Sequence, residues 1–501
     1  MKKNITLLVF SIIISSCQSK KEAPSLDVST SSKFNKLTSL VDYFTEDIIE
    51  KNNASSFALA IYKNGESYHN YYGKINKGAN TTSNDSSLYE IASITKTFTG
   101  ALVAKAVLED KINLEDDIRK YLEGDYLNLE FEGHPITIKN LLTHSLGLRQ
   151  TAPDGFEAMR TKVNNGTYNS KTDTYTIKNL LKELKTVEVD TKPGTAYHYN
   201  SIGPELLAYC LEKVNKTSFN KQINAFFSEI GMQNTYLQAS EKYKARLVRG
   251  YSHDTIAKVD FCPVYGAAGG AISTLPDLAL YMKYLIENKK EPWVKEVSRS
   301  LFVDKEKDEN IGYLWQNIGY AEEEGYFYSK TGTSKGIQSG ILICPDSNYG
   351  IVLMVNNTSD EAINDWANLF FRDIEPDLIK FPKLNLTSIL KKEFKENPVS
   401  AFKNFRKFKS DTTNYFFTLK SLNNFGYNLL SNGNKQKAIS IFKFAVEEFP
   451  KNANAYDSLG EAYFLAEEYD HSLVNYKKAL KLNPSSNSAK TYIKKIEHLK
   501  I

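Results

Sequence analysis

Ser93 and Lys96 form a Ser-x-x-Lys motif at the start of a segment with helical periodicity, residues 93–109. On a helix, the lysine would lie one turn beyond the serine on the same face. The amino end of a helix also favours negative charge on the serine oxygen. The motif occurs five times, but only Ser93 follows an apolar approach, residues 88–92, and precedes a long patterned helix. This context predicts that Ser93 is a nucleophile and Lys96 its partner.

Suitable companions for this serine lie further along the chain. They are a tyrosine after a Pro-Gly pair and a short run that begins with lysine: Tyr199, Lys330, Thr331, Gly332 and Thr333. Two ammonium groups in a partly dry cleft lower each other's pKa and that of a neighbouring phenol. Either a neutral Lys96 or a Tyr199 phenolate could then take the Ser93 proton. Glycine at position 332 would let a substrate backbone approach and pair as an added strand.

Other reactive residue types have structural interpretations. His144 is predicted to stabilise a helix–loop junction, since the nucleophile already has a base. His198 lies between two tyrosines and would face away from the cleft if Tyr199 faces it. Cys210 and Cys344 lie in apolar segments and are predicted to be core residues.

Length and composition describe a globular chain of several domains. The 501 residues suggest roughly three domains, and 41% hydrophobic and 24% charged residues are ordinary values. The formal net charge of +4 provides no basic surface for nucleic acid. Four cysteines exclude a disulfide framework, and the seven histidines form no zinc-binding motif. We therefore expect no metal, no other cofactor and no nucleic-acid partner.

Residues 1–17 resemble a bacterial lipoprotein signal. Two lysines precede the largely apolar residues 5–14, which are too few to span a bilayer as a helix. Small residues then precede Cys17, as at a site where cleavage leaves a lipidated cysteine. Lipidation would anchor the chain to a membrane, and residues 18–35 would form a flexible tether. The alternative is an ordinary secretory signal with an incidental cysteine.

Residues 36–375 combine strand and helix signals in one block. Residues 57–62 and 66–73 are predicted strands around an Asn-Gly turn, and residues 326–355 are predicted to form three more. Helices are predicted over 93–109, 136–142, 202–214 and 361–372. Strands at both ends of the block, with helices between, indicate an α+β sheet closed by its first and last segments.

Residues 421–501 contain a repeat with a period of 34 positions. The repeated pairs are Gly426 and Gly460, Phe442 and Tyr476, Ala445 and Ala479, and Pro450 and Pro484. The pattern resembles two tetratricopeptide repeats, 421–454 and 455–488, with a capping helix. Two repeats are marginal alone, so we expect them to pack on residues 385–410 or on the main domain.

Residues 376–420 connect the two parts. Within them, residues 380–409 carry nine Lys or Arg against two acids. Such a run would suit either an anionic membrane surface or a solvated helical connector. We favour the basic helical connector.

The motifs and their order resemble the class C β-lactamase-like serine hydrolase family, whose members include penicillin-binding-protein-like enzymes. Residues 133–148 and 267–277 resemble further segments of that family. The resemblance covers residues 36–375 and implies a β-lactamase/transpeptidase-like fold, with an antiparallel sheet flanked by helices and an all-helical insert. The predicted architecture is this α+β domain followed by an all-α tetratricopeptide module.

The resemblance implies a role for each site residue. Ser93 would be the acylated nucleophile, Lys96 its base partner, and Tyr199 the general base or a proton relay. Lys330 would hold a substrate carboxylate or tune Tyr199. The backbone N–H groups of Ser93 and Thr333 would form the oxyanion hole. The substrate-binding residues would be Ser201, Thr331, Gly332 and Thr333.

One position departs from the family pattern. The second motif is usually Tyr-x-Asn, whereas Ser201 stands two places after Tyr199 and Asn200 comes one place early. A serine hydroxyl cannot donate and accept across a planar amide as asparagine does. This difference weakens the prediction of a β-lactam or peptide substrate and favours an ester or an atypical amide. A register that begins at Tyr197 fits worse.

Together these observations predict a serine hydrolase at the cell envelope, held by its lipid anchor and facing the periplasm or the outer surface. Its substrate would be a small molecule or a peptide, with an ester, amide or D-amino-acid peptide bond. Two alternatives stay open. One is a β-lactamase or D-Ala-D-Ala carboxypeptidase, and the other is a catalytically inert scaffold whose repeats recruit a protein partner.

Overall fold

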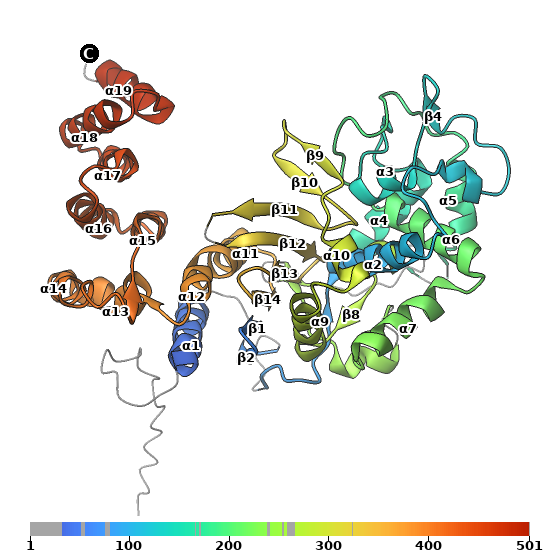
Figure 1. Cartoon of the computed structure of the whole chain (residues 1–501), viewed down its shortest axis with the longest axis horizontal. Helices are drawn as coiled ribbons and strands as arrows, with labels where there is room; N and C mark the ends of the chain where they lie inside the picture. The colour runs from blue at the N-terminus through green and yellow to red at the C-terminus, as the bar shows by residue number, and fades with distance from the viewer. Residues whose placement is uncertain are drawn as a thin grey trace, which may run out of the picture.

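A computed structural model describes most of the chain beyond the predicted signal. The described residues are 33–51, 56–75, 81–165, 167–169, 172–237, 241–252, 255–257, 266–322 and 324–499. Cys17 and the tether up to residue 32 lie outside them. The first helix, α1 (Lys33–Lys51), begins inside the range predicted as a tether. Figure 1 shows a sheet-and-helix domain and, beside it, a column of helices that ends at the C-terminus.

A six-stranded antiparallel sheet forms the centre of the first domain, in the order β11-β12-β13-β14-β1-β2. Its strands are β1 (Ser56–Lys63), β2 (Glu66–Gly73), β11 (Gln316–Ala321), β12 (Gly325–Thr333), β13 (Gln338–Cys344) and β14 (Tyr349–Val355). Asn64 and Gly65 both have positive φ, as a type I′ hairpin requires. Leu59 of β1 stands opposite Leu353 of β14, so the first and last strands pair directly, as predicted.

Both faces of the sheet are covered by helices. Ala58 and Ala60 of β1 join the core that contains α2 (Thr95–Leu108) and α9 (Leu275–Glu287). Phe57 and Leu59, which alternate with them, join a second core with α1, α11 (Asp360–Asn368) and α12 (Glu375–Lys380). Cys210 and Cys344 are free and buried in these cores, as predicted.

A helical lobe extends from the α2 side of the sheet. Its helices are α3 (Ile138–Thr143), α4 (Asp154–Asn165), α5 (Ile177–Glu183), α6 (Ile202–Asn215), α7 (Phe219–Ile230), α8 (Gly266–Gly269) and α10 (Pro292–Val297). Short pairs accompany them: β3 (Tyr89–Glu90) with β8 (Ile272–Ser273), β4 (Glu130–Phe131) with β5 (His134–Pro135), β6 (Tyr251–Ser252) with β7 (Thr255–Ile256), and β9 (Phe302–Asp304) with β10 (Glu309–Ile311). Helix α2 lies centrally, in contact with α6, α7, α8 and α10.

Two predicted helices differ from the structure at one end. The helix predicted from residue 93 begins as a 3-10 turn, η1 (Ala92–Ile94), and becomes α-helical only at Thr95. The helix predicted to residue 372 changes into a π-helical turn, η5 (Leu369–Asp373).

The connector is helical but not fully solvated, which corrects the prediction. It contains β15 (Leu384–Asn385), α13 (Leu386–Glu396), α14 (Pro398–Phe408) and β16 (Tyr415–Phe416). Phe394 of α13 lies 5.8 Å from Phe425, and Phe405 of α14 lies 5.0 Å from Phe444, between ring centres. One face of these amphipathic helices therefore packs on the repeats. This agrees with the expectation that the repeats pack on residues 385–410.

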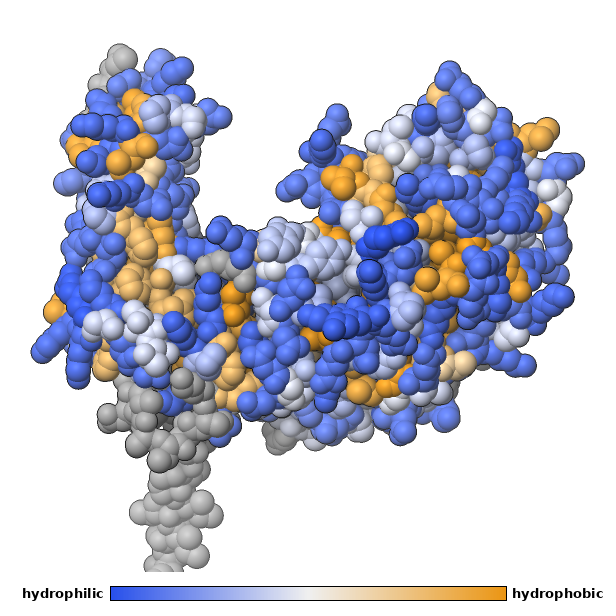
Figure 2. Space-filling view, in the orientation of Figure 1, coloured by the Kyte–Doolittle hydropathy of each residue, from blue (hydrophilic) through white to orange (hydrophobic). Residues whose placement is uncertain are grey.

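The C-terminal column consists of α15 (Leu419–Ser431), α16 (Lys435–Glu448), α17 (Ala453–Leu465), α18 (Tyr469–Leu482) and α19 (Asn487–Leu499). A Cβ at Gly426 would lie 2.5 Å from the Phe442 ring, and one at Gly460 would lie 3.0 Å from the Tyr476 ring. The small and large positions of the repeat therefore interlock as predicted. In Figure 2 the column and the domain stand on either side of a wide notch.

No helix within the described ranges has both the length and the apolar character needed to cross a membrane.

Candidate active site

Ser93 lies in a tight turn that immediately precedes α2. The chain leaves β3 and turns at Ala92, whose φ of +46° is uncommon for a residue with a Cβ. The Ile94 N–H donates to the Ile91 carbonyl at 3.1 Å and closes the turn. Ser93 therefore lies in the turn that enters the helix, two residues before α2 begins at Thr95.

Gly332 brings strand β12 against this turn. A Cβ at position 332 would lie 2.3 Å from the Ile91 carbonyl oxygen and 2.9 Å from the Ser93 nitrogen. Only glycine allows that approach. The Ser339 hydroxyl bridges the carbonyls of Ile91 and Gly332, at 3.1 Å and 2.9 Å. The strand predicted to bind substrate therefore lies beside the Ser93 backbone N–H.

The Ser93 hydroxyl lies between a lysine and a tyrosine. Lys96 Nζ is 3.2 Å from Ser93 Oγ, and the Tyr199 hydroxyl is 2.7 Å from it. Lys96 is 0% exposed and also donates to the Ala268 carbonyl at 2.6 Å, whereas Tyr199 is 37% exposed. The structure thus brings together three residues that the sequence separates by up to 106 positions.

Lys330 completes the group from the side of the sheet. Its Nζ lies 5.2 Å from the centre of the Tyr199 ring and donates to Gln316 Oε1 at 2.6 Å and to the Thr331 carbonyl at 2.8 Å. Lys330 is 1% exposed, and this burial lowers its pKa from 10.5 to about 8. Tyr199 opposes the decrease and the Lys96 ammonium adds to it. The expected effect of one lysine on the other is present but secondary to burial.

The His144 ring packs against the Tyr199 ring. His144 ends α3 in a left-handed conformation, its ring centre lies 4.5 Å from that of Tyr199, and its Nδ1 accepts from the Asn200 N–H at 3.4 Å. Burial, with Lys96 and Lys330 nearby, holds the pKa of His144 well below its usual value. A neutral imidazole at a helix–loop junction agrees with the structural role that we predicted. His198 is exposed.

The second motif is rearranged around the start of α6. Asn200 Oδ1 accepts from the Gly203 N–H at 2.9 Å, and its Nδ2 donates to the His198 carbonyl at 3.0 Å. Its amide is therefore used to hold the local backbone. Ser201 occupies the helix N-cap position and is buried.

The remaining predicted substrate residues lie along β12. Thr331 is half-buried and its carbonyl accepts from Lys330. Thr333 is exposed, and its hydroxyl donates to Gln338 Oε1 at 2.5 Å. Gly332 lies between them at the contact with the Ser93 turn.

Two polar residues of this region carried no motif in the sequence. Gln316 of β11 accepts from Lys330 and donates from its Nε2 to the Tyr197 hydroxyl at 2.7 Å. Glu205 of α6 accepts from the Ala268 N–H at 2.8 Å. Glu205 did leave one signal, because it is a charged residue on an otherwise apolar stretch of helix. Gln316 left none.

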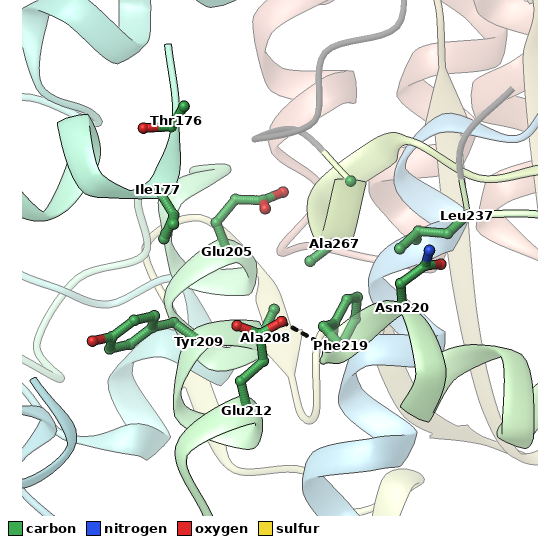
Figure 3. Close-up of a pocket in the computed structure, with 11 residues that line it drawn as sticks. Thr176, Ile177, Glu205, Ala208, Tyr209, Glu212, Phe219, Asn220, Leu237 and Ala267 are labelled. Atoms are coloured by element: carbon green, nitrogen blue, oxygen red, sulfur yellow. Dashed lines mark hydrogen bonds between the residues drawn. The ribbon is translucent and has the colours of Figure 1, made fainter. Parts of the chain in front are cut away.

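A cavity of about 320 Å³ lies beside Glu205 (Figure 3). It is lined by Thr176, Ile177, Glu205, Ala208, Tyr209, Glu212, Phe219, Asn220, Leu237, Gly266 and Ala267. The lining comes mainly from α6, α7 and α8. Glu205 therefore connects the cavity to Lys96, through Ala268.

The chain belongs to the β-lactamase family, whose profile matches residues 41–372. Members of this family include serine hydrolases such as β-lactamases and carboxypeptidases. A tetratricopeptide-repeat profile matches residues 453–486. This range is the predicted second repeat, 455–488, displaced by two residues towards the N-terminus.

Several known proteins are similar over the first domain. Protein flp of Staphylococcus aureus (strain N315) is 26% identical over 331 residues, which cover 64% of this chain and 63% of flp. This chain thus spans less than two thirds of that relative. The D-alanyl-D-alanine-carboxypeptidase/endopeptidase AmpH of Escherichia coli (strain K12) is 22% identical, over 64% of this chain and 84% of AmpH. A β-lactamase/D-alanine carboxypeptidase structure from Yersinia pestis shares the fold, with a TM-score of 0.58 and 21% identity over 69% of this chain and 99% of that one.

Proposed function

We propose that this chain is a serine hydrolase that transfers an acyl group from its substrate to Ser93 and then to water. The observation that carries the proposal is the convergence on one hydroxyl, with Lys96 Nζ at 3.2 Å and the Tyr199 hydroxyl at 2.7 Å from Ser93 Oγ. A serine becomes a nucleophile when an adjacent base takes its proton. The substrate is an ester, an amide or a D-amino-acid peptide.

Two groups are placed to take that proton. A neutral Lys96 amine can accept it directly. A Tyr199 phenolate can also accept it, stabilised by the ammonium groups of Lys96 and Lys330, 5.0 Å and 5.2 Å from its ring centre. The same base returns the proton to the leaving group, and water then attacks the acyl-enzyme. The N–H groups of Ser93 and Thr333 serve as the oxyanion hole, each contributing about 3 kcal/mol.

The surroundings of Lys330 support a role in tuning Tyr199. Two of its three ammonium protons already bond to Gln316 and to the Thr331 carbonyl. The side chain is buried, so little of its charge faces the cleft where a substrate carboxylate would arrive. In this proposal Lys330 acts mainly through its field at the phenol.

The second motif favours an ester or an atypical amide as substrate. The Asn200 amide holds the start of α6, and Ser201 stands where the family usually has asparagine. A D-Ala-D-Ala carboxypeptidase or β-lactamase activity is the second candidate. The end of β12 favours it, because the pairing with β11 stops at Ser329 and the backbone beyond that residue can pair with a peptide-like substrate.

We also propose that the chain is a lipoprotein of the cell envelope, facing the periplasm or the outer surface, with a protein partner for the repeats. The support for the anchor is the sequence of residues 1–17. Metabolic labelling with a clickable fatty acid should mark the unsubstituted chain and not Cys17→Ala. Equal labelling of both chains would contradict the proposed lipid anchor at Cys17.

Turnover of a panel of esters, D-amino-acid amides and β-lactams tests the proposed reaction. Ser93→Ala should abolish all turnover while leaving the circular dichroism spectrum unchanged. Ser440→Ala is the matched control, because Ser440 is half-buried on α16 and begins another Ser-x-x-Lys sequence. Undiminished turnover by Ser93→Ala would contradict the proposal, and no turnover by the unsubstituted chain would favour the inert scaffold.

A further inference from the structure

Glu205 is a carboxyl buried in the lobe that carries the site. It is 6% exposed, and its Oε1 accepts from the Ala268 N–H at 2.8 Å. Burial raises the pKa of Glu205 from 4.5 to about 8, and the Ala268 N–H, the Lys96 ammonium and the Ala267 N–H act against that increase. Burying a carboxyl costs folding free energy, so a task at this position is expected.

Ala268 joins this carboxyl to the lysine beside the nucleophile. Its N–H donates to Glu205, and its carbonyl accepts from Lys96 Nζ at 2.6 Å. The short helix that contains Ala268 is fixed to α2, because the Thr99 hydroxyl donates to the Ala267 carbonyl at 2.9 Å. Thr99 and Glu205 therefore both hold the short helix whose Ala268 carbonyl orients Lys96.

From this arrangement we infer that Glu205 is a positioning residue for acyl transfer. It holds the Ala268 carbonyl in place for the Lys96 amine, and its own charge sets how readily that amine gives up a proton. The inference rests on the proposed function, since it assigns a task within the same reaction.

The titratable groups around Lys96 come from several elements. Glu205 faces it from α6, Lys330 from β12, His144 from the end of α3, and Tyr199 from the segment before α6, while α8 presents backbone groups. Lys330 favours a neutral Lys96, because two ammonium groups repel each other. An ionised Glu205 acts in the opposite direction and stabilises the ammonium form, whereas a neutral Glu205 does not.

The cavity shown in Figure 3 also supplies a matched control. Glu205 and Glu212 both line it and lie about two turns apart on α6. Glu212 has a different contact, since its Oε1 accepts from the Phe219 N–H at 2.7 Å, at the start of α7. Glu212→Gln therefore makes the same chemical change, on the same helix and beside the same cavity, without altering the contact to Ala268.

The test is the pH dependence of the reaction of Ser93 with a fluorophosphonate, which forms a phosphonate ester and releases fluoride, measured on the full chain and on the two glutamine variants. Glu205→Gln keeps an oxygen for the Ala268 N–H and differs in charge from the unsubstituted chain only above about pH 8, where Glu205 is ionised. There, loss of the negative charge lowers the pKa of whichever group takes the Ser93 proton. The first-order labelling rates of the two chains should therefore agree below about pH 8, and above it Glu205→Gln should react about threefold faster or more, with reagent binding unchanged. Glu212→Gln should follow the unsubstituted chain throughout.

A third variant separates positioning from charge. Glu205→Met removes the acceptor as well, so its plateau labelling rate should fall about tenfold below that of Glu205→Gln. Equal labelling rates above about pH 8 for Glu205→Gln and the unsubstituted chain would overturn the inference and leave the proposed function standing. An equal increase in Glu212→Gln would also overturn it. No labelling of the unsubstituted chain would overturn both.

Discussion

Two regions of this chain use glycine to bring segments into close contact, with different neighbours. At the nucleophile, Gly332 faces backbone atoms, and a Cβ there would lie 2.3 Å from the Ile91 carbonyl oxygen. In the repeats, Gly426 and Gly460 face aromatic rings on the next helix. Backbone cannot yield without moving a whole strand, whereas a ring can shift or tilt.

The difference separates what each region has to maintain. The site depends on a few polar atoms held at fixed distances, so a small change there should affect chemistry more than stability. The repeats depend on apolar area and shape, so a change there should affect stability and leave the chemistry unaltered. Variants in each region test this separation.

The largest effect is expected for Tyr199→Phe. The ring stays packed on His144, but the hydroxyl 2.7 Å from Ser93 Oγ is lost. Loss of a positioned acid–base group should lower the acylation rate by about 10²–10⁴-fold, with little change in thermal unfolding. Tyr197→Phe is the neighbouring control and should have a much smaller effect. Equal rates for Tyr199→Phe and the unsubstituted chain would exclude the phenol from the mechanism.

Gly332→Ala should lower acylation by about 100-fold or more, because β12 must move away from the Ser93 N–H. Gly319→Ala is a control in the same sheet, where the atoms nearest to a Cβ would belong to the Phe327 ring, the first at 2.8 Å. That variant should keep its acylation rate. Full activity of Gly332→Ala would show that the contact with the turn is not part of the site.

In the repeats, Gly426→Ala should lower the free energy of unfolding by about 1–3 kcal/mol through overpacking against Phe442. Gly460→Ala should cost less, because its Cβ would lie 3.0 Å from the Tyr476 ring instead of 2.5 Å from Phe442. Denaturant unfolding measures both, and acylation of Ser93 should be unchanged. Loss of acylation in either variant would contradict the claim that changes in the repeats affect stability and leave the chemistry at Ser93 unaltered.

A further effect concerns how the free energy of unfolding depends on pH. The pKa of Glu205 is about 8 in the folded chain against an ordinary value of 4.5. Between these values the folded chain holds a proton that the unfolded chain has released, so the free energy of unfolding falls as pH rises. Glu205→Gln should therefore gain stability relative to the unsubstituted chain between about pH 5 and about pH 8. Chemical denaturation at several pH values measures this. If the two chains differed in free energy of unfolding by the same amount at every pH, Glu205 would not have a raised pKa in the folded chain.

Much of the fold follows from local patterns. The Asn64-Gly65 turn, the strands on either side of it and the glycine–aromatic pairs of the repeats all depend on short-range spacing, and the structure contains them. The connector was misjudged because its lysines dominate the composition, while its buried phenylalanines find partners only in helices that come later in the chain.

The site could be predicted only where residues are linked by a motif. Ser93, Lys96, Tyr199 and Lys330 were found from spacing, order and family resemblance, and the structure brings them together. The contacts of Glu205 depend on where α8 packs against α6, which no local pattern specifies.

The most direct test of the central claim is to map the adduct that a fluorophosphonate leaves on the full chain by peptide mass spectrometry. One adduct is expected, on the peptide that contains Ser93. It should be absent from Ser93→Ala and retained in Ser440→Ala. An adduct elsewhere, or none on the unsubstituted chain, would contradict the claim that Ser93 is an activated nucleophile.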